Sequence, residues 1–359
     1  MQGLNLIFGQ MSLQKSVNLE WVTNLRFIAL FSVIILHASA VLLTQYNKVP
    51  LADWLTADLL NAFVRFSVPV FVMITGALNL GREYEPVDFL KKRLGRIVIP
   101  FLFWSLVYIL YSWYNGEIDF DNDTQTNIRL VLHQLKYGSS YHLWYIYMLI
   151  GLYLFIPVIG KFIRVATQKE ITYFLLLWVI TMFLEQPYVS RFKPQIDLHY
   201  FTGYLGYLVL GYYLSVRTFK TKFLNRFMLL SFVLTGVIIT TGTYLLTKYQ
   251  CKTTTLFYEP LAPFAVWLSI SLFLFIKLSV FHLPPAVKQV RDFVGRYAYG
   301  IFLCHALVLY LLDLIFHIDY KICMSILSIP LTAVLCLALS TSLIWLINKL
   351  PLIGKYVGG

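Results

Sequence analysis

The sequence has 359 residues, of which 59% are hydrophobic and 13% are charged. A soluble domain is about 45–50% apolar and about 25% charged, so this composition excludes a soluble globular domain and indicates a bilayer as the apolar solvent. The net charge of +12 is better explained by basic loops held on the cytoplasmic side of a membrane than by nucleic-acid binding, and we expect no nucleic-acid partner.

Ten apolar stretches are long enough to cross a bilayer, and in lipid they must be helices. In chain order they are 25–44, 60–80, 97–115, 143–163, 171–187, 200–216, 227–247, 258–280, 297–316 and 322–348. We therefore predict an all-α polytopic membrane protein, one bundle of about ten helices that forms a single domain over residues 1–359. Residues 1–23 and 349–359 are expected as cytoplasmic tails, and Met1 and Met11 remain alternative starts.

The distribution of basic residues predicts the orientation of these spans. If the N-terminus lies in the cytoplasm, 20 of the 29 Lys and Arg residues fall on the inner side and 8 on the outer side, while Arg65 lies inside a span. This bias follows the positive-inside rule. The acidic run from Glu117 to Asp123 then falls outside, in agreement. Both termini are expected in the cytoplasm.

Two pairs of residues stand out as candidates for chemistry. Arg26 and His37 lie 11 residues apart in the first span, which places them on one helix face about 16 Å apart along the axis. Arg93 and Arg96, before the third span, also share a face, and two guanidinium groups there could bind phosphates. The alternative for the first pair is an arginine whose side chain reaches the interface and a structural histidine. The alternative for the second pair is an ordinary positive-inside cluster.

Further ionisable groups lie in or near spans, where burial in lipid is costly. Arg65 occurs with a proline and a glycine in one span, which predicts an irregular helix that faces a cavity; a simple kink is the alternative. His142 precedes the fourth span, Glu185 ends the fifth and His305 lies within the ninth. Each of these three is equally explained as a structural group with a satisfied hydrogen bond.

Other chemical signatures are lacking in the sequence. The four cysteines show no metal-ligand spacing, and we expect no metal. There is no phosphate-binding loop, dinucleotide-binding glycine motif, nucleophile elbow or zinc-protease motif.

Taken together, these residues resemble the membrane-bound acyltransferase-3 family over nearly the whole chain. The resemblance rests on the following residues: Asn24-Leu-Arg26 with ten residues before His37; Val68-Pro-Val-Phe71 with Thr75-Gly76; Arg93-x-x-Arg96; His142-Leu-Trp144; Gly211-Tyr-Tyr-Leu214; and Tyr299-Gly-Ile-Phe-Leu-Cys-His305. The chain looks closest to the branch that O-acetylates enterobacterial common antigen. It departs from the family at Thr75, where Ser is usual, and at Phe27, where Gly is frequent.

The resemblance implies transfer of an acyl group, expected to be acetyl, from cytoplasmic acetyl-CoA to a hydroxyl of a surface or lipid-linked glycan. It implies a bacterial inner membrane, with membrane lipid, the glycan and acyl-CoA as partners. His37 would be the catalytic residue and Arg26 its companion, Arg93 and Arg96 would bind CoA, and Arg65, His142, Glu185 and His305 would support the substrate. Direct transfer and an acylated His37 both remain open, as do the acceptor, the acyl length and a homo-oligomeric state.

Two other functions compete with this hypothesis. A transporter or flippase for a lipid-linked glycan would also line its path with intramembrane charges. A non-catalytic component of a membrane assembly would leave the shared face of Arg26 and His37 unexplained.

Overall fold

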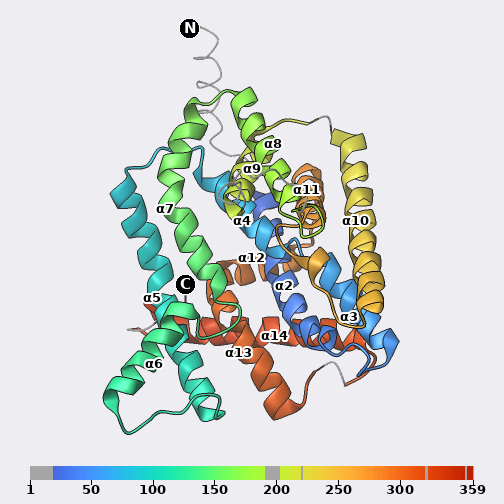
Figure 1. Cartoon of the computed structure of the whole chain (residues 1–359). Coiled ribbons are helices and arrows are strands. Elements are labelled where there is room, and N and C mark those ends of the chain that lie inside the picture. The colour runs from blue at the N-terminus through green and yellow to red at the C-terminus, as the bar shows by residue number, and fades with distance from the viewer. Residues whose placement is uncertain (1–18, 191–202, 220, 320–321, 352–353, 359) are drawn as a thin grey trace.

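The computed structural model describes residues 19–190, 203–219, 221–319, 322–351 and 354–358, and the secondary structure of these residues is helical (Figure 1). The elements are α2 (Glu20–Leu43), α3 (Leu51–Phe63), α4 (Ser67–Asn79), α5 (Pro86–Tyr114), α6 (Thr124–Tyr137), α7 (Trp144–Val165), α8 (Gln168–Leu184), α9 (Tyr204–Val216), α10 (Thr221–Gln250), the 3-10 turn η3 (Leu256–Tyr258), α11 (Pro263–Leu278), α12 (Pro285–Arg296), α13 (Ala298–Phe316), α14 (Ser325–Asn348) and α15 (Gly354–Val357).

The expected polytopic all-α class is confirmed. Within the described residues, eight helical segments are long and apolar enough to cross a membrane, with α3 and α4 together forming one of them. The other two predicted spans correspond to α8, with 17 residues, and α9, with 13 residues. These are the shortest of the ten predicted spans, and at 1.5 Å per residue α9 is only about 20 Å long.

Several helices differ from their predicted ranges. α3 begins at Leu51, nine residues before the predicted span, and α5 begins at Pro86 rather than at residue 97. Two helices, α6 and α12, lie in segments that were expected to be loops. Polar residues lower the hydropathy of these segments, so a length rule for apolar runs overlooks them. α12 packs on the start of α2, where Arg291 donates a 2.6 Å hydrogen bond to Asn24 Oδ1.

The second predicted span is broken into two helices. α3 ends at Phe63 and α4 begins at Ser67, with a turn between them. Pro69 explains the break, because it has no amide hydrogen to donate to the carbonyl of Arg65 and its ring would clash with that carbonyl in a continuous helix. The break places the N-terminus of α4 inside the bundle.

The backbones of α4 and α9 approach each other closely at two glycines. A Cβ on Gly76 would lie 1.8 Å from the carbonyl oxygen of Leu208, and one on Gly211 would lie 2.1 Å from that of Met73. Small residues let helix backbones approach closely in membranes. Gly76 and Gly211 therefore fix the position of α4, and with it the position of its N-terminus.

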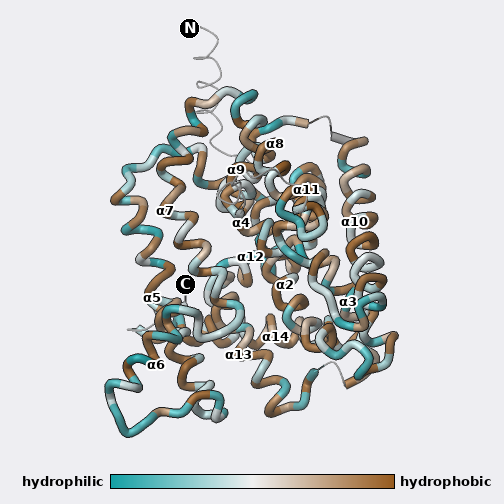
Figure 2. The backbone as a smooth tube through the Cα atoms, in the orientation of Figure 1, coloured by the Kyte–Doolittle hydropathy of each residue, from teal (hydrophilic) through white to brown (hydrophobic). Residues whose placement is uncertain are grey.

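The outward faces of the long helices are apolar. Leu106 and Leu110 on α5, Phe155 and Val158 on α7, and Leu230 on α10 are all exposed. Figure 2 shows hydrophobic residues along α5, α7 and α10, and hydrophilic residues in the connection around α6. This pattern is typical of helices whose outer surface meets lipid.

The end of the described chain is packed against the bundle. The short helix α15 lies in the segment that was expected to be a tail, and the indole of Trp104 on α5 donates a hydrogen bond of 3.4 Å to the carbonyl of Val357. Val357 is buried, and the carbonyl of Gly358 approaches Gly300 of α13. Residues 354–358 are therefore part of the packed structure rather than a free tail.

Candidate functional site

Three histidines from distant parts of the chain meet inside the bundle. The ring centroids of His37 and His305 are 5.3 Å apart, those of His142 and His305 are 4.9 Å apart, and those of His37 and His142 are 6.4 Å apart. They come from α2, from the turn before α7 and from α13. The three histidine candidates that the sequence offered separately therefore form one cluster.

Two of these histidines are fixed by hydrogen bonds to α13 and the neighbouring turn. His142 Nε2 lies 3.3 Å from the carbonyl of Leu303, and its Nδ1 lies 3.1 Å from Ser140 Oγ. His305 Nδ1 lies 2.7 Å from the carbonyl of Phe302. Because carbonyl oxygens only accept, these contacts assign an N–H to His142 Nε2 and to His305 Nδ1.

His37 differs from both neighbours. Among the described residues its ring nitrogens have no hydrogen bond, and the ring packs against Tyr141 with centroids 4.8 Å apart. His142 and His305 are buried, whereas His37 is partly exposed to a cavity. His305 Nε2 also lacks a partner in the described part of the chain, but His305 does not line the cavity, so His37 is the cavity-lining histidine whose ring nitrogens have no hydrogen bond.

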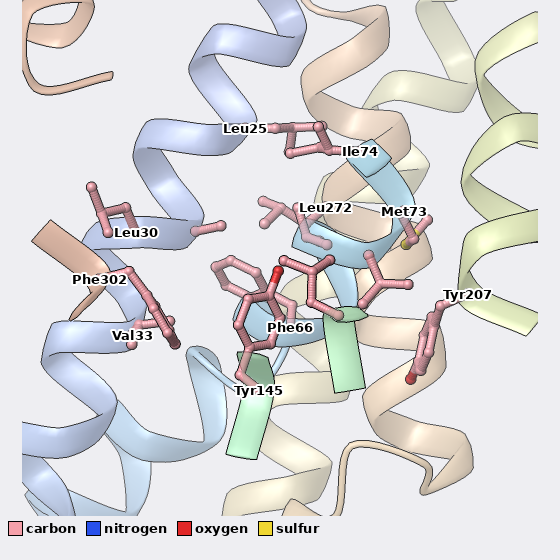
Figure 3. Close-up of a cluster of buried hydrophobic side chains, with 14 of the residues drawn as sticks. Leu25, Leu30, Val33, Phe66, Met73, Ile74, Tyr145, Tyr207, Leu272 and Phe302 are labelled. Atoms are coloured by element: carbon pink, nitrogen blue, oxygen red, sulfur yellow. The ribbon is translucent and has the colours of Figure 1, made fainter. Parts of the chain in front are cut away.

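The cavity beside His37 has a volume of about 130 Å³. Its polar lining includes His37, Arg65, Ser67 and His142, and its apolar lining includes Val33, Leu36, Val68, Trp144, Tyr145, Pro260 and Phe302. Figure 3 shows three of these residues, Val33, Tyr145 and Phe302, in a cluster of buried hydrophobic side chains that also contains Phe66. The space is large enough for a small acyl group rather than for a whole sugar chain.

Arg65 is the arginine that lines the cavity with His37. Its guanidinium group lies 4.2 Å from the centroid of the Tyr258 ring and donates a hydrogen bond to Asn61 Oδ1. The hydroxyl of Tyr258 donates to a carboxylate oxygen of the buried Asp58. The break between α3 and α4 and the place of Arg65 in the cavity lining confirm that this span is irregular and faces a cavity.

Arg26 lies at the other end of α2 and is outside the residues that line the cavity. It lies near Tyr145 and Tyr153 on α7. Tyr145 also lines the cavity, so this residue lies near both Arg26 and the cavity. The predicted role of Arg26 as a companion of His37 remains a prediction.

Arg93 belongs to the same end of the bundle as Arg26. Its guanidinium group donates a 3.0 Å hydrogen bond to Asn79 Oδ1, and it lies near Tyr153, as Arg26 does. Asn79 is the last residue of α4 and is buried. Arg93 is half-buried and held in place, while Arg96, one turn later, is exposed.

Glu185 is not among the residues that line the cavity. It directly follows the last residue of α8, and its amide donates to the carbonyl of Thr181. The same helix end borders a second, larger and mainly apolar pocket through Gln186. The structure therefore groups His37, Arg65, His142 and His305, and leaves Glu185 apart.

Sequence reasoning missed four residues of this region: Ser67, Tyr145, Asp58 and Tyr258. The order Ser67-x-Pro69 after Arg65 was a usable signal, because a proline predicts a helix start within two residues. Tyr145 and Tyr258 lacked such a signal, since tyrosine is frequent throughout the sequence.

No group of three His, Cys, Asp or Glu side chains in the described ranges has an arrangement that could hold a metal ion.

A comparison with known protein families identifies the family of this chain. Residues 19–349 match the acyltransferase-3 family model, which is described as an acyltransferase domain. No curated protein and no solved structure gives a significant match. Because the family match covers nearly the whole chain, the protein belongs to the acyltransferase-3 family of membrane acyltransferases.

Proposed function

We propose that this protein is an integral membrane O-acetyltransferase that moves an acetyl group from cytoplasmic acetyl-CoA to a hydroxyl of a cell-surface or lipid-linked glycan. The observation that carries the proposal is the cavity beside His37, where a histidine without a hydrogen bond, an arginine and a serine face one small space. This combination suits acyl transfer, which needs a base and donors for a developing negative charge.

The inner end of the bundle supports a CoA-binding role. Arg93 and Arg96 lie near the start of α5, next to the exposed Lys91 and Lys92. CoA carries several phosphates, and guanidinium groups bind phosphate oxygens through paired hydrogen bonds. The fixed position of Arg93 on Asn79 reduces the entropy that would be lost when it binds an anion.

The path between the two ends fits the shape of the donor. Arg26 is 11 residues from His37 on α2, or about 16 Å along the helix. Tyr153 and Tyr145 lie along the same interval on α7, with Tyr153 beside Arg93 and Arg26 and Tyr145 at the cavity. With its nucleotide on the arginines, the extended pantetheine arm would follow these side chains and present the thioester to His37.

In the direct mechanism, His37 takes the proton of the acceptor hydroxyl as the oxygen attacks the thioester carbonyl. His142 and His305 hold their rings against His37 through their own hydrogen bonds and so limit its orientation. In the alternative mechanism, His37 is itself acetylated and then gives the group to the acceptor. Both need the same cavity and the same donors.

The acceptor and the membrane are part of this proposal. The sequence resemblance supports a bacterial inner membrane location, and the basic bias supports both ends of the chain on the cytoplasmic side. The acceptor class is a glycan that reaches the membrane surface, and enterobacterial common antigen is the candidate that the sequence resemblance supports. Membrane lipid is the remaining partner.

A transporter of lipid-linked glycan is the second candidate, and the broken α3–α4 span favours it. Interrupted helices with an N-terminus in the membrane are typical of transporter binding sites. A transporter does not consume acetyl-CoA, which separates the two functions.

The test uses the full chain in inner-membrane vesicles that are supplied with acetyl-CoA labelled in its acetyl group. We expect label in the glycan fraction and one free CoA for each acetyl group transferred, both dependent on the chain. Vesicles with the chain that release no CoA and transfer no label, while still moving lipid-linked glycan, would establish the transporter instead.

A further inference from the structure

We propose that the start of α4 forms the oxyanion site of the transfer reaction, with Ser67 Oγ and the guanidinium group of Arg65 as its donors. The proposal rests on the proposed acetyltransferase function. It assigns a role to Ser67, which sequence reasoning missed, and a more specific role to Arg65. The donors would stabilise the negative charge that develops on the thioester oxygen in the transition state.

The N-terminus of α4 lies at the cavity. α4 is 13 residues long and begins at Ser67, and Arg65, Ser67 and Val68 all line the cavity that His37 faces. The N-terminus of a helix carries a partial positive charge. The amides of Ser67 and Val70 already donate to the carbonyls of Val64 and Phe66, and Pro69 has no amide hydrogen, so these positions offer a ligand side-chain donors rather than amide hydrogens. In a low-dielectric membrane interior this terminus favours an anion more strongly than it would in water.

Two hydrogen-bond donors at this terminus lack partners among the described residues. Ser67 is fully buried, and neither its Oγ nor Arg65 Nε has a hydrogen-bond partner among the described residues. Buried polar atoms are nearly always hydrogen-bonded. Both residues line one cavity, so a ligand atom that reaches these two donors would satisfy them.

Arg65 is held in place without the use of its Nε donor. Asn61 accepts from another guanidinium nitrogen, and Asn61 itself is fixed by its 2.8 Å hydrogen bond to Ser39 Oγ. The ring of Tyr258 covers a face of the guanidinium group. This preorganisation is the condition under which an electrostatic donor lowers a barrier, because no rearrangement is needed during the reaction.

The reaction then proceeds as follows. The acceptor hydroxyl oxygen bonds to the thioester carbonyl carbon, its proton passes to His37, and the carbonyl electron pair moves to the oxygen beside Ser67 and Arg65. The carbonyl reforms as the carbon–sulfur bond breaks, and the CoA thiolate takes the proton from His37. The products are the acetyl ester and CoA, and an acetylated His37 would pass through the same oxyanion.

The experiment compares Ser67→Ala with Ser105→Ala in the full chain, using transfer of labelled acetyl from acetyl-CoA in inner-membrane vesicles. Ser105 is the matched control, because it is also buried with an unpartnered Oγ but does not line the cavity. We expect Ser67→Ala to lower kcat about 10²-fold, with KM for acetyl-CoA and the shape of the pH profile unchanged. Ser105→Ala should transfer at the parent rate.

Arg65→Lys adds a second measurement, since it keeps the charge and removes the Nε donor. A lowered kcat with normal acetyl-CoA binding is expected. Parent rates in Ser67→Ala, alongside an inactive His37→Ala, would overturn the oxyanion proposal and leave the proposed function intact. Absence of acetyl transfer by the parent chain itself would instead overturn the proposed function. Equal losses in Ser67→Ala and Ser105→Ala would show a packing effect and also overturn the oxyanion role.

Discussion

The cavity around His37 and the arginine end of the bundle are built in different ways. The cavity draws side chains from α2, the α3–α4 turn, the start of α4, the start of α7, the segment before α11, and α13, and all of them except Trp144 are buried or half-buried. The arginine pair comes from one helix, α5, and one of its two members is exposed. A site assembled from many elements can hold a reacting group in a precise position. An exposed pair on one helix suits the binding of a flexible, charged donor.

This difference predicts how substitutions divide between rate and affinity. Changes in the cavity should reduce the rate of the chemical step, because in the proposed mechanism its groups would meet the reacting atoms. Changes at the arginine end should reduce donor binding, because its groups would meet the distant phosphates. The four predictions below are ordered by the size of the effect that we expect.

The largest effect is expected for His37→Ala. Loss of a positioned base should reduce acetyl transfer about 10²–10⁴-fold, measured as the rate of label transfer from acetyl-CoA in vesicles with equal amounts of protein. His133→Ala is the control, since His133 lies on the exposed helix α6. If His37→Ala transferred at the parent rate while His305→Ala or His142→Ala did not, the catalytic assignment would move within the cluster.

A smaller effect is expected for Arg93→Ala and Arg96→Ala. Each removes a charge-assisted contact to phosphate, which is worth about 1.5–3 kcal/mol, or roughly ten- to a hundredfold in the Kd for acetyl-CoA. Lysine at either position should restore only part of the affinity, because it lacks the planar fork. Calorimetric titration of the purified chain with acetyl-CoA measures this, and parent-like affinity in both variants would place the donor site elsewhere.

Gly76→Ala tests the packing that positions the start of α4. A Cβ here would collide with the backbone of Leu208, so we expect the free energy of unfolding to fall by about 1–3 kcal/mol. Gly151→Ala is the control, because a Cβ at Gly151 meets no atom within 4 Å. Thermal unfolding in detergent compares the two, and equal stability would show that α4 and α9 can separate without loss.

The smallest effect is expected for Glu185→Gln. This residue follows α8 and does not line the cavity, so transfer should stay within about twofold of the parent, as for substitutions away from special features. The same vesicle assay measures it. A large loss of transfer with normal membrane insertion would mean that the functional region extends to the end of α8.

Much of the fold could be predicted from hydropathy, because a lipid-facing helix must be apolar along most of its length. The same rule missed α6 and the first part of α3, where Asp53 and Asp58 reduce the hydropathy. Asp58 is buried nevertheless, since Tyr258 donates to it from 200 positions later in the chain. A contact of this kind depends on tertiary packing and leaves no periodic signal.

The candidate site was predicted in its components but not in its grouping. Helical spacing connected His37 with Arg26, yet the arginine that lines the cavity with His37 is Arg65. Spacing within a helix gives direction along that helix only, and it cannot show which neighbouring helix lies opposite. The meeting of His37 with His142 and His305 is likewise a property of how α2, α7 and α13 pack.

The most direct test of the account is the affinity of the His37→Ala protein for acetyl-CoA, measured beside its transfer rate. The separation of the two regions predicts a Kd equal to that of the parent together with a transfer rate that is lower by about 10² or more. A His37→Ala protein that is folded and inserted but has lost acetyl-CoA binding would contradict the division between a binding end and a reacting cavity. One that binds acetyl-CoA and transfers its acetyl group at the parent rate would contradict the role of His37 in the chemistry.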